Sequence, residues 1–159
     1  NDANKKTRTH TWAIRRADDS AYSHSLDLGH SWDGQPVVHH GVALEVRTPV
    51  RNENPYMVQG HDLVSKKLVF SHSSEDAERM GVLPAGPGRA IVYQYKRNDR
   101  NTQPYFKLIP YDLSTGEAGA AVNLDYWSVA RHNPHQFELV GNILLIREHQ
   151  TLRAWNVSF

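Results

Sequence analysis

Histidine is the residue type that most invites a chemical interpretation here, because it occurs 10 times in 159 residues. Histidine is the commonest metal ligand, and catalytic zinc sites often use three protein ligands. The candidate ligands are His30, His39, His40, His132 and His135. His39 and His40 are adjacent on an expected strand, so their side chains should point to opposite faces, whereas His132 and His135 flank Pro134 in a loop and could converge. Without an H-E-x-x-H pattern, we expect neither a metal nor another cofactor.

Other reactive groupings in the sequence are incomplete. Gly60-His61-Asp62 could supply a general base, but the chain has no G-x-S-x-G nucleophile elbow, and we expect Asp62 to cap a turn. The acidic pairs Asp18-Asp19 and Glu75-Asp76 lie in polar stretches and should be solvated, although glycoside hydrolysis also uses paired carboxylates. Gly86-Pro87-Gly88 lacks the Lys-Ser/Thr of a phosphate loop. The sequence therefore does not predict an enzyme.

The elements that must position any site are short strands. Residues 137–157 alternate β-favouring runs with tight turns, including Gly141-Asn142, which is typical of a strand meander. Similar runs recur from residue 12 onward, and the one helix signal is Ser73 or Ser74 followed by acidic residues. We expect a flexible terminus at residues 1–10 and a single all-β domain at 11–159, with at most one short helix near 73–80. Residues 83–88 should form an irregular loop.

Three segments share a pattern in which an apolar run, a polar tip and a returning strand follow one another: residues 12–28, 91–113 and 144–157. Leu68-Val69-Phe70 begins a fourth, degraded copy. With Tyr-Asp-Leu-Ser-Thr-Gly-Glu at 111–117 as an inter-strand turn, these segments resemble the inner hairpins of β-propeller blades. The resemblance implies antiparallel sheets in a propeller-like or sandwich arrangement, and the chain length disfavours a closed ring. An ordinary β-meander protein remains the alternative.

Bulk properties narrow the class of partner. The formal net charge is +1, which argues against nucleic acid and against a polybasic membrane anchor. No apolar run is long enough for a transmembrane helix, so we expect no membrane insertion. The chain has no cysteine and starts at Asn1 with a polar segment, as a chain does after removal of a signal peptide. We therefore expect a periplasmic or secreted protein.

Binding of another protein is the function that these features favour. Tyr, Trp and Arg dominate interface hot spots, and polar tips on a rigid scaffold can enter a partner's cleft. The expected partner-binding residues are Ser71, His72, Ser73, Ser74, Arg97, Asn98, Asp99, Arg100, Asn101, Tyr126 and Trp127. In size, expected export and lack of cysteine or catalytic motif, the chain is similar to bacterial periplasmic immunity proteins. That similarity implies an inhibitor that occludes the active site of a cognate cell-wall-degrading effector in bacterial secretion and toxin–antitoxin systems.

Two alternatives stay open. In the first, Trp32, Tyr126 and Trp127 form a stacking platform for sugars, and the chain is a carbohydrate-binding or hydrolytic domain. In the second, the chain is a scaffold fragment of a larger propeller.

Overall fold

The computed structural model describes residues 11–15, 21–25, 30–32, 36–49, 55–96, 104–124, 136–148 and 151–157. Within these residues there are strands and turns but no helix, and all strand pairs are antiparallel. The predicted all-β fold of meander sheets is confirmed. The flexible terminus expected at residues 1–10 lies outside the described residues, and the single domain stays a prediction.

The chain begins with a hairpin of β1 (Thr11–Arg15) and β2 (Ala21–Ser25). The first sheet follows, made of β3 (His30–Trp32), β4 (Val37–His39), β5 (Val42–Pro49), β6 (Tyr56–Asp62) and β7 (Leu68–Ser74). Both β3 and β4 pair with β5, one at each of its ends, so that together they form an interrupted edge strand.

The turn between β4 and β5 explains why that part of the chain breaks into two strands. His40 and Gly41 have φ angles of 48° and 76°, the left-handed values that a two-residue type I′ hairpin turn requires.

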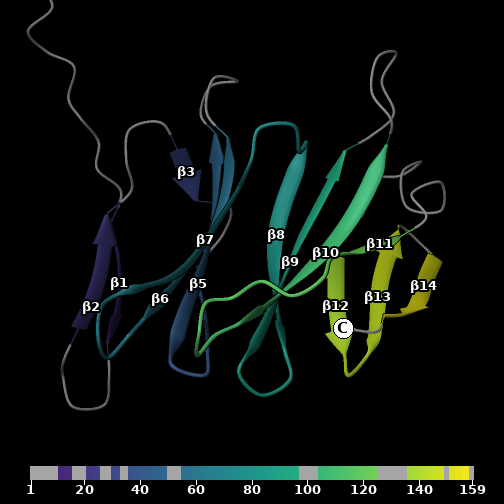
Figure 1. Ribbon diagram of the computed structural model, residues 1–159. Coiled ribbons are helices and arrows are strands. Elements are labelled where there is room, and N and C mark those ends of the chain that lie inside the picture. Colours follow the sequence, from purple (N-terminus) through teal and green to yellow (C-terminus); the bar gives the residue numbers. More distant parts are fainter. Residues whose placement is uncertain are drawn as a thin grey trace, which may run out of the picture.

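The middle sheet contains β8 (Arg79–Ala85), β9 (Arg89–Lys96), β10 (Tyr105–Asp112) and β11 (Val122–Leu124) in sequence order. The last sheet contains β12 (Gln136–Val140), β13 (Ile143–Glu148) and β14 (Thr151–Asn156). Figure 1 shows these sheets succeeding one another across the molecule, with the hairpin β1–β2 on the other side of the first sheet.

Two hydrophobic cores separate the three sheets. The first core lies between the first and middle sheets and includes Leu44, Phe70, Met80 and Val92. The second lies between the middle and last sheets and is built around Phe106, which is fully buried. The middle sheet is therefore covered on both faces, which explains why residues 90–95 form an almost continuous apolar run instead of alternating with polar residues.

The helix expected near residues 73–80 is absent, and the prediction of a helical turn there was wrong. Residues 75–78 bend between β7 and β8, and β8 begins at Arg79. The Ser74 hydroxyl accepts from the backbone N–H of Ala77 at 3.3 Å, as an N-cap would. Serine makes the same bond in an isolated turn, and the pairing of β8 with β9 then takes over the backbone hydrogen bonds.

The predicted irregular loop at 83–88 was also mostly wrong. Leu83, Pro84 and Ala85 belong to β8, and only residues 86–88 form the turn to β9. Leu83 and Ala85 are buried in the second core while Pro84 is exposed. Pro84 lies on β8, an edge strand where a missing N–H is tolerated.

The internal repeat has a partial structural counterpart. Residues 91–113 and 144–157 contain the second and third strands of the middle and last sheets, so these two copies occupy equivalent places. Leu68-Val69-Phe70 belongs to β7, the outer strand of the first sheet, and is not equivalent to them. The hairpin equivalent in position is β5–β6.

Among the described residues no helix has the length and apolarity needed to cross a membrane.

Candidate functional site

Three connections between strands begin or end at one end of the molecule, and the sequence predicts partner-binding residues within or next to each of them. The register of the middle sheet puts Arg79, Tyr95, Phe106 and Leu124 in one row across its four strands. The chain enters or leaves the sheet beside each of these residues. The connections 75–78, 97–104 and 125–135 therefore begin or end at this same end of the middle sheet, which we call the 75–105 end (Figure 1).

A hydrogen-bonded group joins the connection 75–78 to strands β9 and β10 of the middle sheet. The Asp76 carboxylate oxygen Oδ1 accepts from the Ser74 hydroxyl at 2.8 Å and from the Tyr105 hydroxyl at 2.9 Å. The Glu78 backbone N–H donates to the Tyr95 carbonyl at 3.0 Å. The bend after β7 is thus fastened to the start of β10, 29 residues later in the chain.

The ionisation of both partners reflects this contact. Partial burial acts to raise the pKa of Asp76, but the hydrogen bonds from Ser74 and Tyr105, with the nearby Lys96 charge, outweigh it and lower the pKa. Partial burial of Tyr105 and its bond to Asp76 raise the pKa of its hydroxyl to about 12. At neutral pH the pair is a carboxylate that accepts from a protonated phenol.

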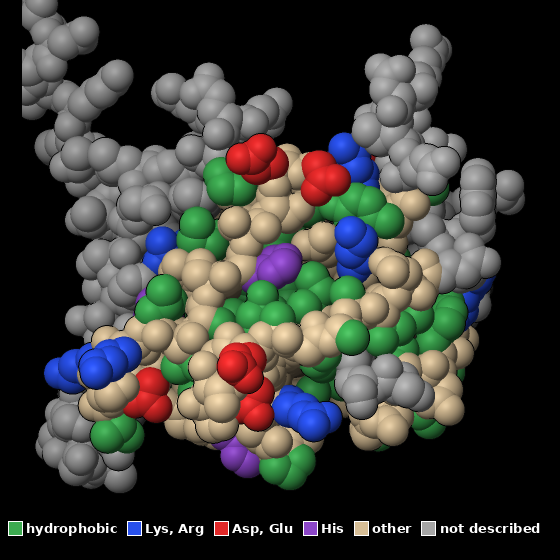
Figure 2. All heavy atoms as spheres, in the orientation of Figure 1, with side chains coloured by type: hydrophobic (Ala, Val, Ile, Leu, Met, Phe, Trp, Pro, Cys, Tyr) green, Lys and Arg blue, Asp and Glu red, His purple; other side chains and the backbone are tan. Residues whose placement is uncertain are grey.

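Charges of both signs surround the pair. Glu75 and Asp76 are exposed at the bend, and the Lys107 ammonium lies 4.9 Å from the centre of the Tyr105 ring, in cation–π contact. Figure 2 shows acidic and basic side chains close together at this end of the molecule. A rigid, mixed-charge surface with an aromatic ring suits polar recognition of another protein.

The described members of the predicted binding set lie in a strand and not in a loop tip. Residues 71–74 complete β7, where Ser71 and Ser73 are exposed and His72 and Ser74 are half-buried. The other predicted residues lie outside the described residues: Arg97, Asn98, Asp99, Arg100, Asn101, Tyr126 and Trp127. A role of either group in binding stays a prediction.

His72 has a structural task that the sequence did not indicate. Its ring nitrogens lie 2.8 Å from the Tyr111 hydroxyl and 2.9 Å from Gln94 Oε1. The geometry fits a ring whose Nε2–H donates to Gln94 while Nδ1 accepts from Tyr111. Because β7 belongs to the first sheet and the partners belong to the middle sheet, His72 ties the two sheets together.

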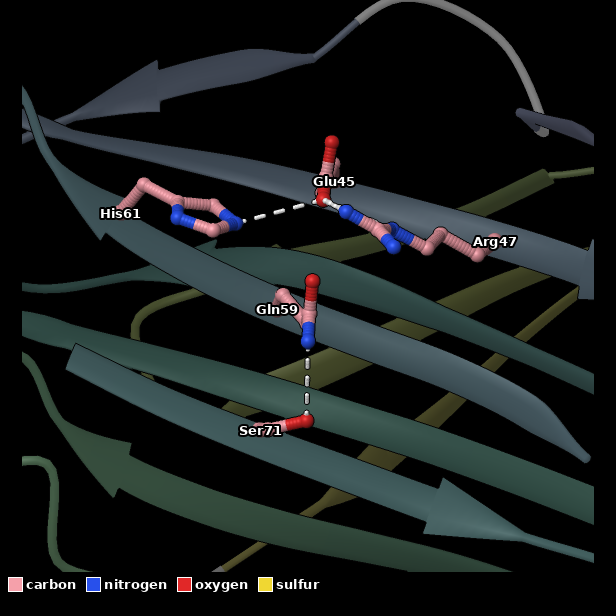
Figure 3. Close-up of polar contacts among 5 residues, drawn as sticks. All are labelled: Glu45, Arg47, Gln59, His61 and Ser71. Atoms are coloured by element: carbon pink, nitrogen blue, oxygen red, sulfur yellow. Dashed lines mark hydrogen bonds and ion pairs between the residues drawn. The ribbon is translucent and has the colours of Figure 1, made fainter. Parts of the chain in front are cut away.

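A second polar cluster lies on the face of the first sheet away from the middle sheet. Glu45 Oε1 accepts from Arg47 Nε at 2.9 Å, from Arg47 Nη2 at 2.7 Å and from His61 Nε2 at 3.2 Å (Figure 3). Gln59 and Ser71 extend the polar row onto β6 and β7, with Gln59 Nε2 donating to Ser71 Oγ at 3.2 Å. Only 1% of Glu45 and 5% each of Arg47 and His61 is exposed.

This cluster corrects the sequence-based pairing of His61 with Asp62. Adjacent strand residues face opposite ways, and His61 meets Glu45 while Asp62 Oδ1 accepts from the backbone N–H of Val64. The expected turn cap at Asp62 is confirmed. Sequence reasoning missed Glu45 and Arg47, although opposite charges two residues apart on a strand share a face. Because Arg47 of the same strand already neutralises Glu45, the cluster favours a structural ion pair within β5, which the hydrogen bond to His61 links to β6, over a proton relay.

The histidine pair is arranged differently from the expectation. His40 is in the turn instead of the strand, so the rings of His39 and His40 meet edge to face with centroids 4.6 Å apart. His39 Nε2 lies 2.9 Å from the Gly86 carbonyl and donates to it. No group of three metal-ligating side chains occurs in the part of the chain that the structure describes. His132 and His135 lie outside that part, and so do the side chains of His30 and Trp32.

A cleft of about 330 Å³ opens at the opposite end of the middle sheet. It is lined by Arg89, Tyr111, Asp112, Glu117 and the stretch from Ala118 to Val122. Asp112 is already used by the adjoining turn, where its carboxylate accepts from the Ser114 hydroxyl and backbone N–H. The cleft therefore offers small apolar groups together with the exposed Arg89 and Glu117 side chains, and no described set of converging reactive groups.

Comparison with known proteins adds no relative: no protein-family model matches the sequence, and no curated protein does so either.

Proposed function

We propose that this protein is a protein-binding inhibitor whose partner docks on the 75–105 end. The observation that carries the proposal is the hydrogen bond from Tyr105 to Asp76. It fastens the bend that follows the predicted residues 71–74 to the start of β10, the strand that comes after the predicted residues 97–101. Loops that bind partners are most effective when a rigid scaffold holds them, because less conformational entropy is then lost on docking. Two buried cores supply such a scaffold beneath this surface.

In its sharpest form the proposal is a periplasmic immunity protein that blocks a cell-wall-degrading effector. Such an inhibitor needs an exposed, mixed-charge surface and no catalytic group of its own. The exposed Glu75 and Asp76 beside Lys96 and Lys107 meet the first need. The absence of cysteine suits an exported protein that folds without disulfides.

The direct test is capture of the partner from the organism that encodes the chain. The tagged protein is incubated with an extract of the cell envelope and secreted fraction, and bound proteins are identified by mass spectrometry. We expect one enriched hydrolase with a dissociation constant of about 10 nM or tighter, as is common for enzyme–inhibitor pairs. Adding the chain should abolish digestion of purified cell wall by that enzyme.

Two charge reversals locate the surface. Glu75→Arg changes the 75–105 end, whereas Glu117→Arg makes the same change at the opposite end of the middle sheet; both side chains are exposed. We expect Glu75→Arg to weaken inhibition at least about tenfold and Glu117→Arg to leave it unchanged. Equal effects of the two variants would refute the assigned surface, and a captured enzyme that stays active would refute inhibition. Glycan binding without any captured protein would instead support the carbohydrate-binding alternative.

A further inference from the structure

The last sheet has one face in the second core and one open face. Leu144 and Ile146 of β13 are fully buried against the middle sheet. On the opposite face Val140 is 54% exposed, Ile143 46% and Leu152 65%. Large apolar side chains grouped on one sheet face indicate an interaction surface. We call this face the outer face of the last sheet.

Strand register arranges the outer face as a grid of three rows. Residues two apart on a strand share a face, and the pairing places Val140, Ile143 and Asn156 in the first row. Glu138, Leu145 and Ala154 form the second row, and Gln136, Arg147 and Leu152 form the third. Leu145 stands at the centre and is half-buried.

The two charged residues of the grid have opposite signs and are both exposed: Glu138 on β12 and Arg147 on β13. No ion pair joins them to each other or to any residue that the structure describes. They lie on opposite sides of the diagonal that runs from Gln136 through Leu145 to Asn156. A surface with one exposed charge of each sign about an apolar centre can complement a copy of itself.

We propose that the outer face binds the outer face of a second copy of this chain, about a two-fold axis along that diagonal. Rotation about this axis places Glu138 against Arg147 of the second copy, and Arg147 against its Glu138. It also places Val140 on Leu152, Ile143 on Ala154, and Leu145 on Leu145. Every apolar residue of the grid then meets another, and both charges are paired, as a two-fold interface requires.

The geometry of such a dimer is a known mode of sheet packing. Because the diagonal lies about 36° from the strands, rotation about it makes the strands of the two copies cross at about 70°, which is closer to the orthogonal class than to the aligned class. The grid spacings are about 6.7 Å along a strand and about 4.8 Å between strands. Their difference is smaller than the length of a side chain, so the paired residues of the two copies can still touch. This dimer is independent of the proposed inhibitor function, because its contacts lie on a different sheet from the 75–105 end.

The first test is the mass of the whole chain in solution. Sedimentation velocity between about 1 and 100 μM should show a monomer–dimer equilibrium, the range expected for a modest interface. Ile143→Lys puts a charge in the apolar part of the grid and should shift the protein to monomer. Val64→Lys is the matched control, because Val64 is 70% exposed in the turn after β6, and its dimer should be unchanged.

The second test exchanges the charges. Glu138→Arg alone, or Arg147→Glu alone, sets like charges together at two places and should weaken the dimer about tenfold or more. The double variant Glu138→Arg/Arg147→Glu restores opposite charges and should recover most of that loss. Circular dichroism of each variant checks that the fold is intact. A monomer at every concentration, a dimer indifferent to Ile143→Lys, or no recovery in the double variant would each overturn the proposal.

Discussion

Single residues hold the elements of this protein together, because one carboxylate or one imidazole ring forms hydrogen bonds with two other side chains. Glu45, His72 and Asp76 each contact two side chains, from partners that lie 2 to 39 positions away in sequence. The turn cap at Asp62 was readable in advance, whereas the contact between Glu45 and Arg47, two residues apart on β5, was missed. The distant contacts were not readable in advance, because hydrogen bonding across sheets depends on which strands the chain brings together.

Replacing Tyr105 with Phe removes the hydroxyl that donates to Asp76 and keeps the ring. We expect the free energy of unfolding at pH 7 to fall by about 1 kcal/mol, because a surface hydrogen bond to a carboxylate is lost. Urea denaturation measures the change. Ser73→Ala, at an exposed position of β7, is the control. Tyr93→Phe is not used, because the Tyr93 ring packs over Gly81.

The same variant should alter the dependence of stability on pH at both extremes. The folded-state pKa of Asp76 is lowered, so its stabilisation is present above the unfolded pKa near 4 and is lost as pH falls through the folded value. Tyr105 has a folded pKa raised to about 12, so stability should be lost as pH rises from about 10 towards 12, where only the unfolded chain ionises readily. Both slopes should be smaller in Tyr105→Phe, and parallel pH profiles would contradict the assigned contact.

Among the elements, the turn after β10 shows how a local motif acquires a tertiary role. Asp112 accepts from the backbone N–H groups of Ser114 and Thr115, which fits the inter-strand turn expected at 111–117. Gly116 then packs directly on the Val69 carbonyl of β7. The turn type was predictable from its residues, whereas its contact with another sheet was not.

Gly116→Ala should therefore destabilise the protein more than a turn glycine normally would. Gly116 has a φ of +77°, and an added Cβ would overlap the Val69 carbonyl oxygen. Gly141→Ala is the matched control, because its φ is +60° with nothing within 4 Å of the added atom. We expect about 1 kcal/mol for Gly141→Ala from backbone strain alone and about 2–4 kcal/mol for Gly116→Ala, measured by denaturation. Equal costs would show that the turn can move away from β7.

For the whole molecule, stability depends on the middle sheet, which contributes to both cores. Phe106 is fully buried there and stacks between Tyr93 and Tyr95, with ring centroids 6.4 and 6.0 Å away. If the three sheets form a single domain, as predicted, then loss of this packing should destabilise all three sheets together.

Phe106→Ala should lower the free energy of unfolding by about 3–5 kcal/mol, because it removes a buried ring and leaves a cavity. Val64→Ala, at a site 70% exposed, should change it by less than about 0.5 kcal/mol. In both proteins circular dichroism and tryptophan fluorescence should report one transition. Separate transitions would mean that the sheets unfold as more than one domain.

The sequence by itself determined the all-β class, most strands and several turns, since alternation, β-favouring residues and turn chemistry act over a few residues. Tertiary structure alone decided that residues 75–78 bend without forming a helix, that His61 meets Glu45, and that His72 and Tyr105 each reach across to another element. These outcomes depend on sheet pairing and sheet stacking, which bring together residues far apart in the chain and outweigh local preferences. The same stacking buries Leu144 and Ile146 of the last sheet but leaves Ile143 and Leu152 exposed on its outer face.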